Sequence, residues 1–235
     1  MKNINYIIFI SALVLFAVGA CSKTKTVVSP VSINIIHAMP DGNPILPVFG
    51  NEKVSYYSSA QTISYGGYQL YSQMSNDGIL SVVSLGDTSR TIYKETLSFM
   101  PGYIYSLFMA GDTIKPDVLL SQDTIPLFND SSVGVRFVNL SIDKTPLSIA
   151  IEGNVSPEPE FSSMQYLKIS SFKKYSANSL IPGNYTFEVR DDLTGDVLTT
   201  FTWTYVVSKS NTLVISGSKD PNSSTPMTIF PVNNY

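Results

Sequence analysis

The chain has 235 residues, with 15 lysines and arginines against 18 aspartates and glutamates, and a formal net charge of −3. Only 14% of the residues are charged and the cations do not cluster, which argues against nucleic-acid binding, because such proteins need grouped cations to displace counterions. The 14 tyrosines and 12 phenylalanines, with abundant serine, threonine, valine and isoleucine, favour strands. No stretch after the N-terminal segment keeps apolar residues at helical spacing for three turns, so the sequence predicts an all-β protein.

The N-terminus has the features of an export signal. Lys2 precedes an unbroken apolar run over residues 6–20, which is shorter than the roughly 20 apolar residues that span a bilayer. The four residues Val-Gly-Ala-Cys that end at Cys21 resemble the bacterial lipobox. The resemblance implies a signal peptide over residues 1–20 and a lipidated Cys21, carrying acyl chains such as palmitate, at the start of a flexible tether over 21–30. The alternative is an ordinary cleavable signal with an incidental cysteine.

Cys21 is the only cysteine, so no disulfide can form within the chain. Acyl chains on this residue would attach the protein to a membrane, because each buried methylene contributes about 0.8 kcal/mol. We therefore expect an outer-membrane lipoprotein of the cell envelope, with the periplasmic and the surface face both open. The composition resembles that of Bacteroidota exports.

One pattern occurs twice in the chain. An alternating apolar segment, an Asp and Pro turn, a second strand and a Gly-Asn pair follow one another over residues 33–51 and again over 135–154. Aspartate and proline break strands, and Gly-Asn supplies the positive φ of a reversal. Seven or eight short strands in about 100 residues fit an antiparallel β-sandwich of Ig-like or related topology. We predict two tandem sandwich domains, at 31–126 and 133–235, with a linker at 127–132.

The two openings carry a family resemblance. Ile-Ile-His-Ala-Met-Pro-Asp, ending at Asp41, and Val-Arg-Phe-Val-Asn-Leu-Ser-Ile-Asp, ending at Asp143, resemble the V-R-V-V-H-A-S-P-D-A-P signature of DUF4397 domains. The likeness covers most of residues 31–232, although Asn139 stands where the signature has histidine. It implies two tandem DUF4397-like repeats, which are β-sandwiches of exported bacterial proteins with no established activity.

Catalytic and metal-binding patterns are weak in this sequence. His37, the only histidine, stands four residues before Asp41 and fits either a triad with a serine or a hydrogen bond to the turn backbone. Asp191, Asp192 and Asp196 fit either a calcium or glycosidase site or an ordinary hairpin turn. We expect no catalytic residue, no metal and no cofactor.

The first repeat is rich in tyrosine, and Tyr65, Tyr68 and Tyr71 are candidate ligand-binding residues. A tyrosine offers a flat apolar face and a polar tip, which suits a sugar ring or a partner surface. In a strand, however, Tyr68 and Tyr71 point to opposite faces, so at least some of these rings belong to the core.

Thr113 and Thr124 lie in Asp-Thr-Ile triplets that resemble the O-glycan acceptor of Bacteroidota exports. The predicted partners are the membrane, through the anchor, and a glycan or another envelope protein. The predicted function is a non-catalytic binding, adhesion or structural role in the envelope. The alternative is an envelope glycan-active hydrolase that uses acidic residues.

Overall fold

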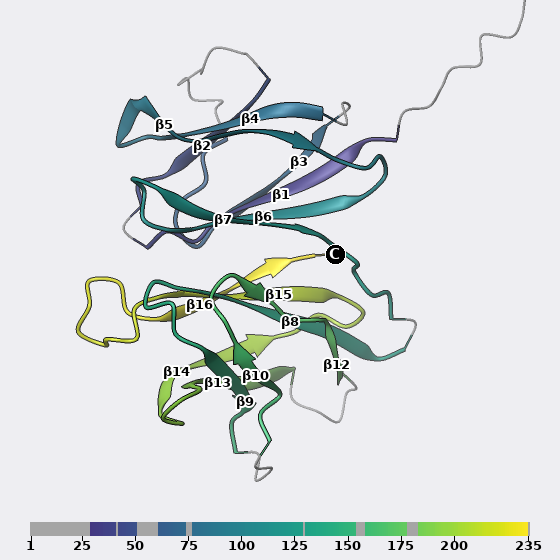
Figure 1. Ribbon diagram of the computed structural model, residues 1–235. Coiled ribbons are helices and arrows are strands. Elements are labelled where there is room, and N and C mark those ends of the chain that lie inside the picture. Colours follow the sequence, from purple (N-terminus) through teal and green to yellow (C-terminus); the bar gives the residue numbers. More distant parts are fainter. Residues whose placement is uncertain are drawn as a thin grey trace, which may run out of the picture.

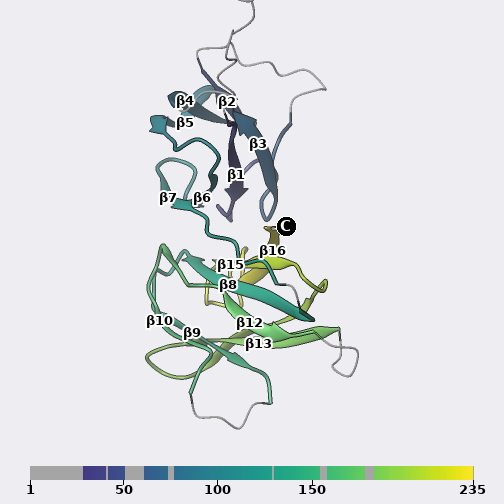
Figure 2. The ribbon, with the colours of Figure 1, turned by 90° about the vertical axis from the view of Figure 1, so that its right-hand side faces the viewer.

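The computed structural model describes residues 29–40, 42–50, 61–73, 77–128, 130–153, 158–177 and 183–234. The predicted signal peptide and Cys21 lie outside these residues. All regular elements in the described ranges are strands, and none of these ranges contains a helix able to cross a bilayer. Four sheets are stacked in the order shown in Figure 1, and the perpendicular view in Figure 2 shows the same stacking. The predicted all-β fold with two sandwiches is confirmed.

The first half is a sandwich of two sheets. Its outer sheet has the strand order β2-β4-β5 and its inner sheet the order β3-β1-β6-β7. The strands are β1 (Val31–His37), β2 (Ile45–Phe49), β3 (Tyr68–Gln73), β4 (Asp77–Ser84), β5 (Asp87–Ser98), β6 (Ile104–Gly111) and β7 (Pro116–Gln122).

The second half repeats this arrangement. Its inner sheet has the order β11-β8-β15-β16, with β12 also paired to β8, and its outer sheet the order β10-β9-β13-β14. The strands are β8 (Ser132–Ser141), β9 (Leu147–Ile151), β10 (Phe161–Met164), β11 (Lys168–Ile169), β12 (Lys173–Ser176), β13 (Asn184–Asp191), β14 (Val197–Thr204), β15 (Ser210–Gly217) and β16 (Thr228–Asn233).

The two inner sheets share an unusual feature for a fold built largely of antiparallel pairs. In each half the first strand pairs in parallel with a late strand, β1 with β6 and β8 with β15. The predicted reversals also match, because Gly50 and Gly153 both adopt positive φ, at 77° and 73°. Such values favour glycine, which lacks the Cβ that makes this conformation costly.

Each half has its own apolar core between its two sheets. In the first half, alternate residues of β1 such as Ile33 and Ile35 pack against Leu80 and Val82 of β4. In the second half, Trp203 is 1% exposed and belongs to an aromatic core. Four rings contact it, those of Tyr175, Tyr185, Phe187 and Tyr205.

A third apolar cluster joins the two halves. It lies where the outward face of β3-β1-β6-β7 meets that of β11-β8-β15-β16, a contact that we call the seam. Its fully buried members are Ile36, Ala38, Phe108 and Ala110 from the first half, and Val138, Leu140, Val214 and Val232 from the second. All ten residues of β8 and all eight of β15 are therefore buried, although their side chains alternate between two faces.

We expect Phe108→Ala to lower the free energy of unfolding by about 3–5 kcal/mol, because it leaves a cavity in the seam. The fluorescence of Trp203, in the other half, reports the loss in a urea titration if the seam couples the halves. Leu120→Ala, at a position 40% exposed on β7, is the matched control and should change stability by about 0.5 kcal/mol or less. An unchanged Trp203 transition in Phe108→Ala would contradict the coupling.

Candidate binding cleft at the seam

Polar side chains gather at one end of the seam, near the start of the inner strands. In the parallel registers, Asn34 of β1 lies opposite Ser106 of β6, and Arg136 of β8 lies opposite Thr212 of β15. Each of these residues sits two positions before an apolar seam residue on its strand, so strand alternation points it toward the other half. This polar end of the seam lies directly beside its apolar cluster.

A buried hydrogen-bond network crosses the polar end. Arg136 donates from Nη2 to Asp123 Oδ1 and from Nε to Thr212 Oγ1, both at 2.8 Å. Ser106 Oγ donates to the other oxygen of Asp123 at 2.6 Å, and Thr212 Oγ1 donates to Asn234 Oδ1 at 2.6 Å. The ion pair is almost fully buried, with 5% and 1% of its two side chains exposed. These bonds join Ser106 and Asp123 of the first half to the second half.

Asn34 is different from these partners. It is 5% exposed, and its buried Oδ1 has no hydrogen-bond partner. An unpaired buried acceptor costs about 1–3 kcal/mol, so such groups are few in folded proteins and each needs an explanation. A half-turn of the carboxamide about χ2 exchanges the positions of its carbonyl oxygen, which accepts, and its NH2 group, which donates. Asn34 can thus offer a ligand either kind of hydrogen bond.

A cavity of about 240 Å³ adjoins Asn34 at this end of the seam. We call it the seam cleft. It is smaller than the pockets that hold drug-sized ligands, and its size suits a ligand of about one ring. Both polar and apolar side chains line it, from Asn34, Tyr68, Leu70, Ile104, Ser106, Asp123, Ile125, Asn233 and Asn234.

The structure separates the three candidate tyrosines. Tyr68 packs on the seam cluster and lines the seam cleft. Tyr71 points to the opposite face of the same strand, into the core of the first half, where its ring lies 5.2 Å from that of Phe49 and burial raises its pKa to about 12. Tyr65 donates a hydrogen bond to Ser216 of the second half at 3.3 Å. These three residues therefore form no common platform.

The other predicted sites are dispersed. Thr113 is half-buried in the turn after β6, and its carbonyl oxygen accepts a hydrogen bond from Arg90 at 2.9 Å. Thr124 is exposed in the segment that joins the two halves. O-glycosylation of both threonines stays a prediction, as does lipidation of Cys21.

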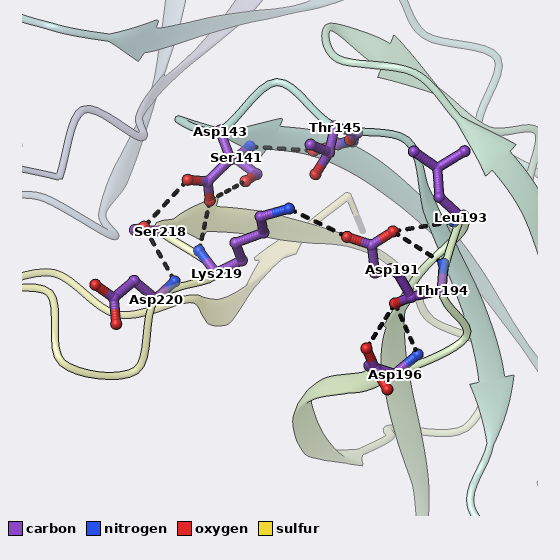
Figure 3. A network of polar contacts seen from close by, with 11 residues as sticks. Ser141, Asp143, Thr145, Asp191, Leu193, Thr194, Asp196, Ser218, Lys219 and Asp220 are labelled. Carbon is purple, nitrogen blue, oxygen red and sulfur yellow. Dashed lines mark hydrogen bonds and ion pairs between the residues drawn. The ribbon is translucent and has the colours of Figure 1, made fainter.

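Four aspartates of the second half, namely Asp143, Asp191, Asp196 and Asp220, belong to the network of polar contacts drawn in Figure 3. Asp191 Oδ1 accepts from the Leu193 N–H at 2.9 Å, and its Oδ2 accepts from Lys219 Nζ at 3.3 Å. The hydrogen bond from the Leu193 N–H, and to a smaller extent the one from Lys219, holds the pKa of Asp191 below its ordinary value. Asp196 accepts from Thr194 within the same turn. The hairpin interpretation is confirmed, and within the described residues no three His, Cys, Asp or Glu side chains form a metal site.

His37 closes a turn of the backbone. Its Nδ1 accepts from the Met39 N–H at 3.3 Å, and its Nε2 donates to the Asn43 carbonyl oxygen at 3.1 Å. Asn139 makes the same two bonds in the second half, accepting from the Ser141 N–H and donating to the Thr145 oxygen. The prediction that His37 forms hydrogen bonds with the turn backbone is confirmed. An asparagine can take the place of this histidine in the second half, because its amide has an acceptor and a donor in equivalent places.

Comparison with known families agrees with the opening motif. The family model described as "Domain of unknown function (DUF4397)" matches residues 31–150, just over half of the chain. The chain belongs to the DUF4397 family. The DUF4397 match covers the first half and continues through β8 into β9. It includes Asn34, Tyr68 and the buried pair Asp123–Arg136, so most of the seam cleft lies within the DUF4397 region.

No curated protein matches the DUF4397 chain. The solved structures that match it include three at 12% identity each. CBMbc, a family CBM26 module of Eubacterium rectale Amy13K in complex with maltoheptaose, has a TM-score of 0.27, with 86% of this chain and 96% of that chain covered. A streptococcal virulence factor that binds α-glucan has a TM-score of 0.26, with the same coverages. The Bacillus anthracis TIE protein has a TM-score of 0.24, with 87% and 44% covered. At these TM-scores the likeness carries no argument about a ligand.

Sequence reasoning missed three residues of the polar end, namely Asn34, Asp123 and Arg136. One signal for them existed: Arg136 is the only charged residue of an otherwise apolar and small-residue strand, β8. A cation in such a strand needs a buried partner. The partner, Asp123, lies outside any strand, so strand patterns could not identify it.

We expect Arg136→Met to lower the free energy of unfolding by about 3–5 kcal/mol, because it leaves Asp123 buried without its cation. The double variant Arg136→Met/Asp123→Leu should recover most of this loss in urea titrations. Lys174→Met breaks an exposed pair with Asp130 and should cost at most about 1 kcal/mol. Equal losses in Arg136→Met and Lys174→Met would contradict this account of the seam.

His37 should make stability depend on pH. Burial lowers its pKa below the ordinary 6.5, so the unfolded chain binds a proton below about pH 6.5 that the folded chain does not bind. The free energy of unfolding therefore falls as the pH drops below that value, by at most about 1.4 kcal/mol per pH unit for one group. Urea titrations between pH 7.5 and 5 give the free energy of unfolding of the wild type and of His37→Asn at each pH. Plotted against pH, the two free energies should converge or cross as the pH falls, and two parallel curves would contradict this role.

Proposed function

We propose that this protein is a lipid-anchored, non-catalytic binding protein of the cell envelope that holds a carbohydrate in the seam cleft. The anchor is Cys21 at the end of the export signal, which places the protein on the outer membrane. We further propose that residues 133–235 are a second DUF4397-like copy, supported by the matching sheet orders of the two halves.

One observation carries the ligand assignment: Asn34, whose buried Oδ1 is unpaired, lines a cavity together with further polar groups. Sugar hydroxyls donate and accept hydrogen bonds, so they can pair with this amide in either of its orientations. Asn233 and Asn234 add amide donors to the same lining, because their Oδ1 atoms already accept from Asn211 and Thr212. Ser106 adds a hydroxyl oxygen that can accept, because its proton is donated to Asp123. A neutral, hydroxyl-rich ligand can satisfy this set without introducing a charge.

The apolar side chains that line the cleft fit the same class of ligand. Tyr68, Leu70, Ile104 and Ile125 stand beside the polar groups. A sugar ring has apolar C–H faces as well as hydroxyl edges, and a tyrosine ring can cover such a face. The cleft therefore offers both surfaces that one sugar unit requires.

The cleft is better suited to binding than to hydrolysis. Glycosidases use two carboxyl groups on either side of the scissile bond. Of the residues that line the seam cleft, Asp123 alone has a carboxyl group, and both of its oxygens are engaged by Arg136 and Ser106. The acidic turn around Asp191 is occupied by its own backbone bonds and by Lys219. These contacts favour a binding role over the alternative of a glycan-active hydrolase.

We expect the wild type to bind a subset of neutral glycans on an array, and Asn34→Ala and Tyr68→Ala each to weaken that binding by about tenfold, the value of one lost hydrogen bond or ring contact. Asn222→Ala removes an amide from an exposed loop and is the matched control. Calorimetry with the best glycan gives the affinities, and mass spectrometry should recover that glycan intact. Absence of glycan binding by the wild type, or cleavage of the glycan, would overturn the proposal.

A further inference from the structure

The turn between β5 and β6 presents apolar side chains to solvent. Met100 is 50% exposed and Tyr103 is 46% exposed. No charged residue occurs from Thr96 to Gly111, a stretch of 16 residues that contains this turn. A turn of this composition is unusual at a protein surface, where loops are ordinarily polar.

The N-terminal end of the described chain lies against this turn. The Gly102 N–H donates to the Pro30 carbonyl oxygen, and the Ser32 N–H donates to the Tyr103 carbonyl oxygen, both at 3.2 Å. A Cβ on Gly102 would come within 3.6 Å of the Ser29 side chain. In Figure 1 the start of β1 and this turn lie at the same end of the upper sandwich. The chain that leads from the predicted anchor therefore enters the fold beside the exposed turn.

The length of that chain limits how far the turn can be from a membrane. Cys21 and Ser29 are eight residues apart, which span at most about 29 Å when fully extended. Lys23 and Lys25 lie in this stretch, and their positive charges are attracted to an anionic membrane surface. An acylated Cys21 thus keeps the turn close to the lipid headgroups.

We propose that the turn Met100–Tyr103 inserts into the headgroup region of the bilayer that holds the anchor. This inference rests on the lipid anchor of the proposed function. Tyrosine is enriched at membrane interfaces, where its ring meets apolar chains and its hydroxyl meets water. Met100 adds an uncharged apolar side chain, and the turn has no charged group that would lose its hydration.

A second exposed apolar residue provides the comparison. Ile114 is 77% exposed in the turn after β6, so the full length of that eight-residue strand separates it from Met100. At about 3.3 Å per residue, the two positions lie at opposite ends of a strand of roughly 26 Å. Asp112 and Lys115 flank Ile114, which places charges in its turn. The membrane contact should protect position 100 and leave position 114 in water.

The experiment uses the full chain, acylated and reconstituted into vesicles of phosphatidylethanolamine and phosphatidylglycerol. Met100→Cys and Ile114→Cys each introduce a single free thiol, because acylation occupies the Cys21 sulfur, and each is labelled with a nitroxide. Collision of the nitroxide with a water-soluble nickel chelate, measured by electron paramagnetic resonance, should be roughly fivefold lower at position 100 than at position 114, as expected for burial to headgroup depth. Emission from buried Trp203 verifies that both variants are folded.

Three outcomes would overturn the inference, and they differ in what else they affect. Acyl chains on Cys21 in the intact mass, with equal nickel collision at both labels, contradict the membrane contact and leave the anchor standing. An intact mass without acyl chains contradicts the anchor and the membrane contact together. Protection of position 100 in the vesicle-free Cys21→Ala protein assigns the turn to a second copy of this chain instead of a membrane.

Discussion

The fold depends on one constraint: the inner strands of both halves are apolar on both faces. Ile35 and Ile36 point to opposite sides of β1, as Phe137 and Val138 do on β8, and all four are fully buried. One face of each inner sheet is covered by the outer sheet of the same half, and the second face is covered by the other half. Burying a large aliphatic or aromatic side chain contributes about 1.5–3 kcal/mol, so an isolated half would leave a substantial apolar surface in water. The seam therefore makes two similar sandwiches into one body.

The polar end of the seam follows from the same geometry. Asn34 and Arg136 occupy positions on the strand face that turns toward the other half, so their polar groups enter a contact that excludes water. Arg136 is satisfied by Asp123 and Thr212, whereas the Oδ1 of Asn34 is left unpaired beside a cavity. A sandwich pair that needed only stability could place apolar residues there, since replacing buried ion pairs by well-packed apolar groups is often neutral or stabilising. The retained polar set is the physical basis on which we propose a ligand at this position.

Much of the fold could be predicted from the sequence because strand alternation, turn residues and the repeated opening are local signals. The split of Tyr68 and Tyr71 between two faces follows from alternation alone, as does the core position of Trp203. The seam could not be predicted in this way: alternation states that Ile36 points away from the core of its own half, but not which surface covers it. The cleft was missed for the same reason, because Asn34, Asp123 and Asn234 meet only after the halves have docked.

Native-state hydrogen exchange of the β1 and β8 amides tests the central claim most directly, because these strands lie on opposite sides of the seam. If the seam makes the two halves one cooperative body, the slowest amides of both strands exchange through the same opening, with equal opening free energies and equal dependence on denaturant. Distinct opening free energies for β1 and β8, each with its own smaller denaturant dependence, would show that the halves open independently and would contradict the account.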